Sequence, residues 1–379
     1  MFDRIPRAGI GLAVMLLIAA CSPTAASPSA APASQPATAA PTEAPPASAP
    51  AESSSAAASG DRHTPEEVDA ATGEHHVSSI YAVPKTLKEK YLLAFLNPGR
   101  SVPFFVDWSD GMNAAADYYG VDLIETDLDL KFENTVSSYE SISGQDPDVL
   151  GTLTTAGVAL KAQADKVGLP IIPIDIAIEG NPYYLGVPNE KSGQFAGDYI
   201  AKAAAAKLAG DWAGRNVVYI GLGSTNPEVQ KRTLGALEEI RKTIPIDDAN
   251  VVHLLCDGQA EPCNTATVDA LTAHPNDVFL IVGMNDEAGV GGLQAVKAQG
   301  RAKDALMVTL GADKAGRDIL RSDSDGVMIG AVDYNPWAEG WSWVEAALAV
   351  AEGEGDQFKE YDVNRVITRD NVDEIYPDN

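Results

Sequence analysis

Residues 277–289, DVFLIVGMNDEAG, join an apolar run to a polar tip. The run Val278–Val282 contains no polar residue, which is typical of a strand buried on both faces of a parallel sheet. It ends at Gly283, and the triplet Asn285-Asp286-Glu287 precedes a stretch with helical spacing. Open α/β sheets build their ligand sites at strand ends of this kind. We therefore expect a parallel α/β sheet with a polar crevice at this edge.

Two further strands end in the same way. Met307–Gly311 runs into Ala312 and Asp313, and Pro170–Ile174 runs into Asp175. Since the carboxyl ends of neighbouring parallel strands meet at one edge, these side chains are expected to share the crevice.

Strands and helices alternate in two successive series, which predicts parallel strands joined by right-handed crossovers. Each series is near the size of one domain, so the fold class predicted is α/β with two similar Rossmann-like lobes. The first lobe is expected over 89–187 plus 334–362, and the second over 188–333 plus 363–379. The expected strands are Tyr91–Leu96, Val121–Glu125, Asp148–Gly151 and Pro170–Asp175, then Asn216–Gly221, Val251–Leu255, Val278–Val282 and Met307–Leu310.

A helix is expected after the first strand, ending at Gly120. Its apolar residues Phe105, Trp108, Met112, Ala115 and Tyr119 recur with a spacing of three or four. Because Trp108 lies on this stripe, we expect it in the core rather than in the crevice.

The N-terminus resembles a bacterial lipoprotein signal peptide over residues 1–20. Arg4 and Arg7 precede the apolar run Ile10–Ala20, which is too short to remain as a membrane-spanning helix. The small residues before Cys21 resemble a lipobox, so we expect Cys21 to carry the lipid; an ordinary thiol is the alternative. Residues 21–60 are rich in Ala, Pro, Ser and Thr and predict an extended tether. This indicates an extracytoplasmic protein held at the bacterial cell membrane, on the cell surface or in the periplasm.

The formal net charge of −27 argues against nucleic acid and against adsorption to anionic lipid. Residues 61–88 show no clear period and are expected to be an irregular lead-in. Within it we expect the pair His75 and His76 to be solvated, because no acidic or cysteine spacing completes a metal site.

Cys256 and Cys263 remain once Cys21 is assigned to lipid. In an exported protein such a pair indicates a disulfide, with two free thiols as the alternative. A zinc site that uses His253 lacks further ligands.

Enzyme and cofactor motifs are missing. The segment from Gly221 to Ser224 lacks the last glycine of a dinucleotide loop, and Lys131 stands where a calcium loop needs an oxygen ligand after Asp127 and Asp129. We therefore expect a binding protein without cofactor or metal. An enzyme that uses Asp175 or Asp313 as acid or base is the weaker alternative.

The polar residues at the strand ends suit a small polyhydroxylated ligand. Planar Asp, Asn and Arg side chains can each engage two neighbouring hydroxyls, and aromatic rings cover the C–H faces of a sugar. Each Asp or Asn here could also be a helix cap, and Phe105 also fits the core stripe. The candidate set is Phe104, Phe105, Asp175, Arg232, Asn285 and Asp313.

Several ordered stretches of the chain resemble the ribose/galactose-type (type I) substrate-binding proteins of ABC transporters. They are PFFVDWSDGMNAAADYYGVDL, LPIIPID, NEKSGQFAGDYIAKAAA, QKRTLGAL, TAHPNDVFLIVGMNDEAGVGGLQAV and LGADKAGRDIL.

This resemblance implies two lobes joined by hinge crossings near Val187–Asn189, Val332–Tyr334 and Asp362–Asn364. It implies that Phe104 and Phe105 stack on the sugar, that Asp175, Arg232, Asn285 and Asp313 bind its hydroxyls, and that Tyr334 lies nearby. We also expect a monomer whose partners are a small sugar or polyol and an ABC permease.

The chain departs from that family at three positions. Ribose binders usually carry Arg directly after the aspartate at 175, and here the residue is Ile176. Val102 replaces a common Asn, and the aromatic expected near Gly258 is absent. A cyclitol, a furanosyl signal molecule or a nucleoside is the alternative ligand, and a chemosensory role is the alternative to uptake. A lactose-repressor-type regulator shares the fold, but a signal peptide stands where its DNA-binding segment would be.

Overall fold

The first lobe contains a parallel sheet with helices on both faces. This computed structural model describes residues 61–75, 77, 81–355, 359–360 and 365–377, all within one compact unit. The strand order is β2-β1-β3-β4. These strands are β1 (Leu92–Asn97), β2 (Asp122–Asp127), β3 (Val149–Thr152) and β4 (Ile171–Pro173).

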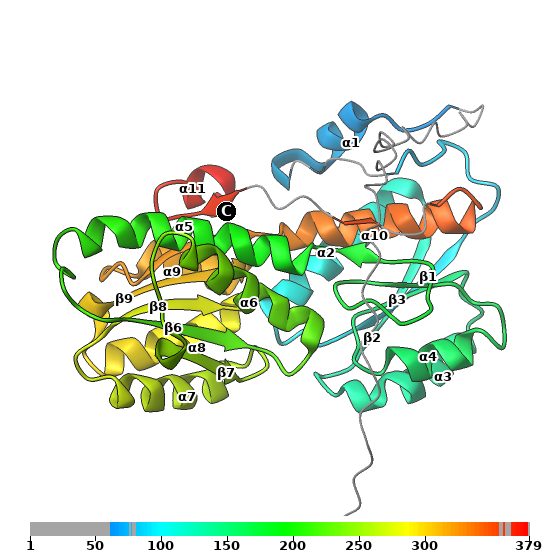
Figure 1. Ribbon diagram of the computed structural model, residues 1–379. Helices are drawn as coiled ribbons and strands as arrows, with labels where there is room; N and C mark the ends of the chain where they lie inside the picture. Colours follow the sequence, from blue (N-terminus) through cyan, green and yellow to red (C-terminus); the bar gives the residue numbers. More distant parts are fainter. Residues whose placement is uncertain (1–60, 76, 78–80, 356–358, 361–364, 378–379) are drawn as a thin grey trace, which may run out of the picture. The chain divides into compact units, whose positions relative to one another are not determined.

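Two separate apolar cores cover the faces of this sheet. One face packs against α2 (Pro103–Tyr119) and α10 (Pro336–Ala351), and the other packs against α3 (Thr135–Ser143) and α4 (Gly157–Ala164) (Figure 1). Trp108 is fully buried in the first of these cores, which confirms its predicted place.

The second lobe has a six-stranded sheet in the order β12-β10-β9-β8-β6-β7. Only β12 runs antiparallel to its neighbour among the described strands of this sheet. The strands are β6 (Val217–Gly223), β7 (Val251–Leu255), β8 (Val278–Gly283), β9 (Ala305–Gly311), β10 (Met328–Asp333) and β12 (Val366–Ile367).

Helices again cover both faces of this sheet. One face carries α5 (Asn189–Leu208) and α6 (Pro227–Arg241), and the other carries α7 (Ala260–Ala273) and α8 (Asp286–Ala298). The other described helices of this lobe are α9 (Lys314–Ser322) and the short α11 (Val372–Ile375). Along the described chain, 3-10 turns lie at Gly73–His75, Phe132–Asn134, Asp248–Asn250 and Ala302–Asp304. The predicted fold class, two α/β lobes with parallel sheets, is confirmed.

The chain passes between the lobes more than once. After β5 (Leu185–Gly186) it enters α5 of the second lobe, and after β10 it returns through α10, which packs on α2 of the first lobe. The strand β11 (Lys359–Glu360) pairs with β5, and β12 then pairs in the second sheet. The expected crossing at Asp362–Asn364 lies outside the described residues, as do the signal peptide, Cys21, the tether and His76.

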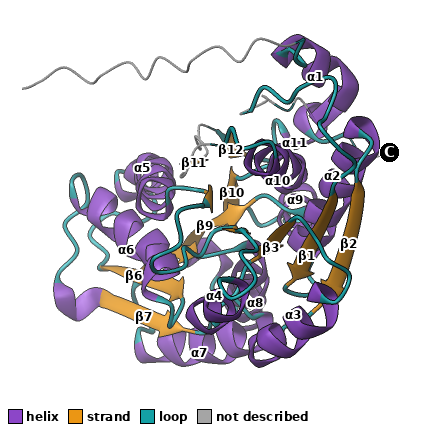
Figure 2. Cartoon of the chain, turned by 90° about the vertical axis from the view of Figure 1, so that its right-hand side faces the viewer, coloured by secondary structure: helices purple, strands orange, loops and turns teal. Residues whose placement is uncertain are grey.

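The backbones of α2 and α10 are in direct contact, and Figure 1 and Figure 2 both show the two helices side by side. A Cβ atom on Gly111 would overlap the carbonyl oxygen of Trp337, and one on Gly340 would overlap that of Trp108. Only glycine allows two helices to approach so closely at these positions.

The lead-in differs from the irregular segment that the sequence predicts. Residues Pro65–Thr72 form α1, which begins with a capping box between Thr64 and Glu67. Val68 is buried in the core of the first lobe. His75 is not simply solvated, because its ring stacks on Trp337 with 3.8 Å between centroids. The acidic, alanine-rich sequence hides this helix, because few of its residues are apolar.

Within the part of the chain that the structure describes, no helix combines the length and the apolar character needed to cross a bilayer.

Candidate functional site

A cleft of about 420 Å³ lies between the two lobes, and both lobes line it. The structure brings all of the sequence-predicted ligand residues to this cleft, which are Phe104, Phe105, Asp175, Arg232, Asn285, Asp313 and Tyr334.

The aromatic pair lies in the first turn of α2, directly after Pro103. Phe104 and Phe105 meet edge to face with 5.8 Å between their centroids, and both rings are half-buried. Phe104 packs against the cores of both lobes and lies edge-on to Tyr334 at 6.5 Å. Its ring is therefore available as a platform at the point where the lobes meet.

Asp175 and Arg232 form an ion pair between the lobes. Asp175 follows β4 with a φ of +58°, a conformation that L-residues other than Asn and Asp rarely adopt. One carboxylate oxygen accepts the N–H of Val187 at 3.2 Å, and the other lies 3.5 Å from Arg232 Nη2. Burial raises the pKa of Asp175, and the nearby guanidinium opposes that shift.

Arg232 is positioned by partners that the sequence did not indicate. Its Nε donates to Asn189 Oδ1 at 2.6 Å, and its Nη1 donates to the carbonyl of Met284 at 3.1 Å. Asn189 begins α5 directly after the first crossing. Its position at the start of the second lobe was the only feature of the sequence that could have indicated a role in the site. A guanidinium has five N–H groups, and these contacts leave capacity for ligand oxygens.

The ring of Tyr334 packs against the guanidinium of Arg232. Its hydroxyl is 2.9 Å from Ser192 Oγ, and its ring lies 5.0 Å from the Arg232 guanidinium carbon. Burial raises the pKa of Tyr334 to about 12 although Arg232 opposes the shift, so the phenol stays neutral. In this arrangement Tyr334 orients the arginine with its face.

Asn285 and Asp313 are helix caps as well as cleft residues. Asn285 Oδ1 accepts the N–H of Ala288 at 2.9 Å, and Asp313 Oδ1 accepts that of Gly316 at 3.1 Å. Asn285 Nδ2 also donates to the carbonyl of Gly258 at 3.2 Å. The capping interpretation therefore holds for both residues, and the caps fix side chains that also line the cleft.

Asp286, which lines the cleft, and Glu339 on α10 are two further buried carboxyls, and neither was among the predicted ligand residues. Asp286 accepts from Thr309 Oγ1 and, at 2.8 Å, from the N–H of Asp313. Burial and then the charge of Asp313 raise the pKa of Asp286 well above its ordinary value. Glu339 accepts from Trp108 Nε1 at 2.8 Å, and burial followed by Asp175 raises its pKa well above its ordinary value. Asp286 belongs to the polar tip after β8, whereas nothing in the pattern of α10 singled out Glu339.

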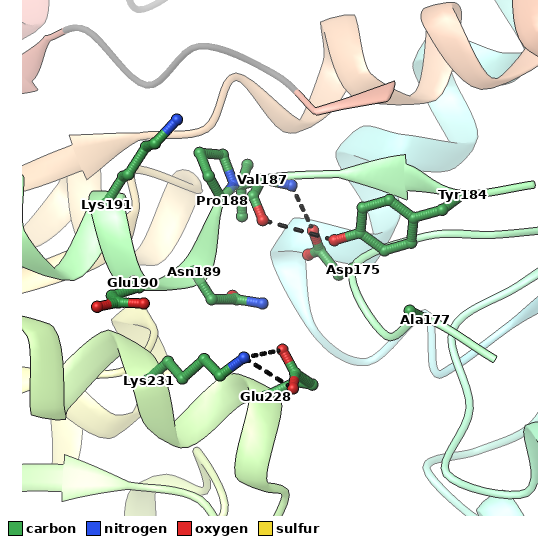
Figure 3. Close-up of a pocket in the computed structure, with 10 residues that line it drawn as sticks. All are labelled: Asp175, Ala177, Tyr184, Val187, Pro188, Asn189, Glu190, Lys191, Glu228 and Lys231. Carbon is green, nitrogen blue, oxygen red and sulfur yellow. Dashed lines mark hydrogen bonds and ion pairs between the residues drawn. The ribbon is translucent and has the colours of Figure 1, made fainter. Parts of the chain in front are cut away.

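A second cavity of about 220 Å³ adjoins Asp175 on the side of the first crossing (Figure 3). Figure 3 shows Lys231 bound to Glu228, and Tyr184 beside Val187. Because Asp175 lines both cavities, this space continues the region of the interlobe site rather than forming a remote one.

Cys256 and Cys263 form a disulfide with 5.1 Å between their Cα atoms. It joins the end of β7 to the first turns of α7. The loop that it closes contains Asp257 and Gly258, which line the cleft.

The match to a known family decides the class of this protein. A family model described as a periplasmic binding protein domain matches residues 93–355. The chain belongs to the periplasmic binding protein family. As a periplasmic binding protein it is a substrate-binding receptor and not an enzyme, as the sequence predicts.

Individual relatives agree with this assignment. A ribose import binding protein of Salmonella typhimurium is 27% identical over 268 residues, covering 68% of this chain and 83% of the relative. An ABC transporter periplasmic solute binding protein from Actinobacillus succinogenes with bound D-allose has a TM-score of 0.64 at 21% identity, covering 75% of this chain and all of that one.

A protein from Mycobacterium smegmatis in complex with β-D-fucofuranose has a TM-score of 0.63 at 22% identity, covering 76% of this chain and 94% of its own. The structural likeness places this periplasmic binding protein in the type I fold.

Proposed function

We propose that this periplasmic binding protein holds a small sugar or related polyol between its lobes and delivers it to an ABC permease. The observation that carries the proposal is the convergence of Asp175, Arg232, Asn285 and Asp313 from both lobes on one cleft beside the Phe104 ring. Charged and amide groups of this kind match the paired donors and acceptors of neighbouring hydroxyls. The sugar-binding relatives support the choice of ligand class.

Ribose itself fits this cleft less well than the name of the first relative suggests. Ile176 lines the cleft directly after Asp175, and its side chain offers no hydrogen bond. A ligand hydroxyl buried there would lose about 1–3 kcal/mol. A cyclitol, a furanosyl signal molecule or a nucleoside is the second candidate class, and a chemosensory receptor is the second candidate role.

A thermal-shift screen of the full chain tests the ligand class. Pentoses, hexoses, cyclitols and nucleosides are compared, and a ligand at about 100 times its dissociation constant adds about 2.7 kcal/mol of stability. We expect a sugar or cyclitol to give the largest shift, with ribose at least about tenfold weaker by calorimetry, the loss that one unpaired hydroxyl predicts. A shift with nucleosides alone would reject the sugar assignment, and ribose as the tightest ligand would reject the role of Ile176.

The anchoring of the receptor is also a proposal. The lipobox-like sequence before Cys21 supports a lipid-anchored receptor outside the cytoplasm. Mass spectrometry of the exported chain should find a lipid-modified Cys21 at its N-terminus. Cys21→Ser should release the protein from the membrane fraction, and retention of that variant would contradict the anchor.

A further inference from the structure

One side of the cleft is lined by apolar side chains, which cannot hydrogen-bond to the hydroxyls of an unsubstituted sugar. Leu130, Phe132, Leu153 and Ile176 all belong to the first lobe and line the cleft. We call these four residues the apolar ledge. None of them is fully buried, and Leu130 keeps 43% of its surface exposed.

Leu130 is held on the ledge by a strained turn. Its φ is +58° and that of Asp129 is +54°, a region that leucine rarely occupies. Two hydrogen bonds fix this turn. The N–H of Leu130 donates to the carbonyl of Pro98 at 2.7 Å, and the N–H of Asp129 donates to Asp127 Oδ1 at 2.7 Å. Strain of this kind persists where the surroundings over-determine it, and it is concentrated at functional sites.

The second lobe contributes a wall of opposite character to the same cleft. Ser224, Thr225, Asp257 and Gln259 line it. The Asp257 carboxylate accepts from Ser224 Oγ at 2.9 Å and from the N–H of Thr225 at 2.6 Å. Asp257 is exposed, so a ligand that took water from its carboxylate would have to offer it a polar group in return.

A ligand with one polar face and one apolar face would match both the polar wall and the apolar ledge. Its hydroxyls would meet the polar wall and the Asp175/Arg232 pair, and an apolar group would cover the ledge. A fully hydroxylated ring would instead bury a hydroxyl against Leu130 and Ile176, where it finds no partner. The cleft volume of about 420 Å³ leaves room for such a group, since it falls in the range of pockets that hold molecules larger than one ring.

We propose that the ligand is a sugar or polyol that carries an apolar substituent, such as a methyl, alkyl or aryl group, and that this substituent lies on the apolar ledge. The proposal rests on the function proposed above and narrows its ligand class.

Calorimetry of the full chain with matched pairs tests the proposal. D-galactose is compared with D-fucose, which lacks one terminal hydroxyl, and D-glucose and D-mannose are compared with their methyl and phenyl glycosides. For every ring that binds, we expect the substituted member to bind about tenfold more tightly, the discrimination that a small apolar pocket gives.

Two substitutions locate the preference. Leu130→Asn keeps a residue that tolerates positive φ, and Ile176→Ser replaces a ledge residue that belongs to none of the apolar cores. Each should reduce the preference to about threefold or less, and should change the affinity for the unsubstituted sugar less, because the loss falls on the apolar contact. Leu234→Asn is the control, since Leu234 is 44% exposed on α6 and does not line the cleft.

The outcomes separate the two proposals. If unsubstituted sugars bind as tightly as their partners, or if the preference survives in both ledge variants, the ledge proposal is wrong and the sugar receptor stands. If only an unsubstituted pentose or cyclitol of the thermal-shift screen binds, the ledge proposal is also wrong. If neither these pairs nor any sugar or cyclitol of that screen binds, the proposed function itself fails.

Discussion

Arg232 Nη2 lies 3.5 Å from the carboxylate of Asp175, and the two side chains belong to different lobes. Both are buried, yet their contact is longer than a good charge-assisted hydrogen bond. The two side chains therefore face each other without forming a short hydrogen bond. A ligand hydroxyl can donate to the Asp175 carboxylate and accept from the Arg232 guanidinium.

Replacing Arg232 by Ala should weaken ligand binding by about ten- to a hundredfold, because hydrogen bonds to a charged group contribute about 1.5–3 kcal/mol each. Calorimetry with the strongest ligand of the screen measures the loss. Arg241→Ala is the control, since Arg241 lies on the same helix and outside the cleft. An unchanged affinity in Arg232→Ala would remove this residue from the site.

Trp108→Phe should lower stability and spare affinity. The indole is fully buried and donates to Glu339, so the substitution leaves a void and removes one buried hydrogen bond, at a cost of about 1–3 kcal/mol. Urea denaturation measures the loss, and Glu339→Gln in the same background should reduce it. A large drop in affinity without a drop in stability would instead assign Trp108 to the ligand.

Asp286→Asn should flatten the pH dependence of stability. Burial raises the folded-state pKa of Asp286 above the unfolded value of about 3.9. Between these two values the folded chain binds more protons, so its stability falls as pH rises through that window. The stability of the variant relative to the wild type should therefore increase from about pH 4 upwards.

Urea denaturation across this range checks the sign, with Asp318→Asn on the exposed side of α9 as the control. A stability of Asp286→Asn relative to the wild type that falls as pH rises would show that the folded-state pKa of Asp286 is lowered rather than raised.

The Cys256–Cys263 bond should add only modestly to stability. The cysteines are separated by 7 residues, and a loop this short gains less than the about 3 kcal/mol expected for about 15 residues. Denaturation of the Cys256→Ala/Cys263→Ala variant measures the effect, and mass spectrometry of non-reduced peptides tests the bond. Two free thiols in exported protein would contradict it.

Ligand binding should close the lobes, because the groups that contact the ligand come from both and a buried ligand cannot enter a closed cleft. Small-angle scattering should show a smaller radius of gyration at saturation. The Arg232→Ala variant at the same ligand concentration is the control. An equal radius with and without ligand would argue for a preformed site.

The alternation of apolar runs and helical stretches was enough to predict the two lobes, because each buried strand forms a continuous apolar segment. The candidate residues at the strand ends were also recognisable, since three apolar runs each lead into Asp or Asn. Their partners were not. Asn189 and Glu339 reach the site only through the crossings and the return of α10, which no local pattern encodes.

The apolar ledge could not be predicted from the sequence either. Leu130 and Phe132 lie in a loop whose sequence first suggested only a failed calcium motif, and Leu153 follows a short strand. Their shared position becomes visible only when the turn at Asp129 and Leu130 is folded against Pro98.

The contact of α2 with α10 through Gly111 and Gly340 also bears on how the receptor signals that it is full. Helices whose backbones touch cannot slide past each other without a clash, so α2 and α10 can be displaced only together. In the receptor role proposed above, α2 and α10 would therefore change position together when the lobes close on a ligand.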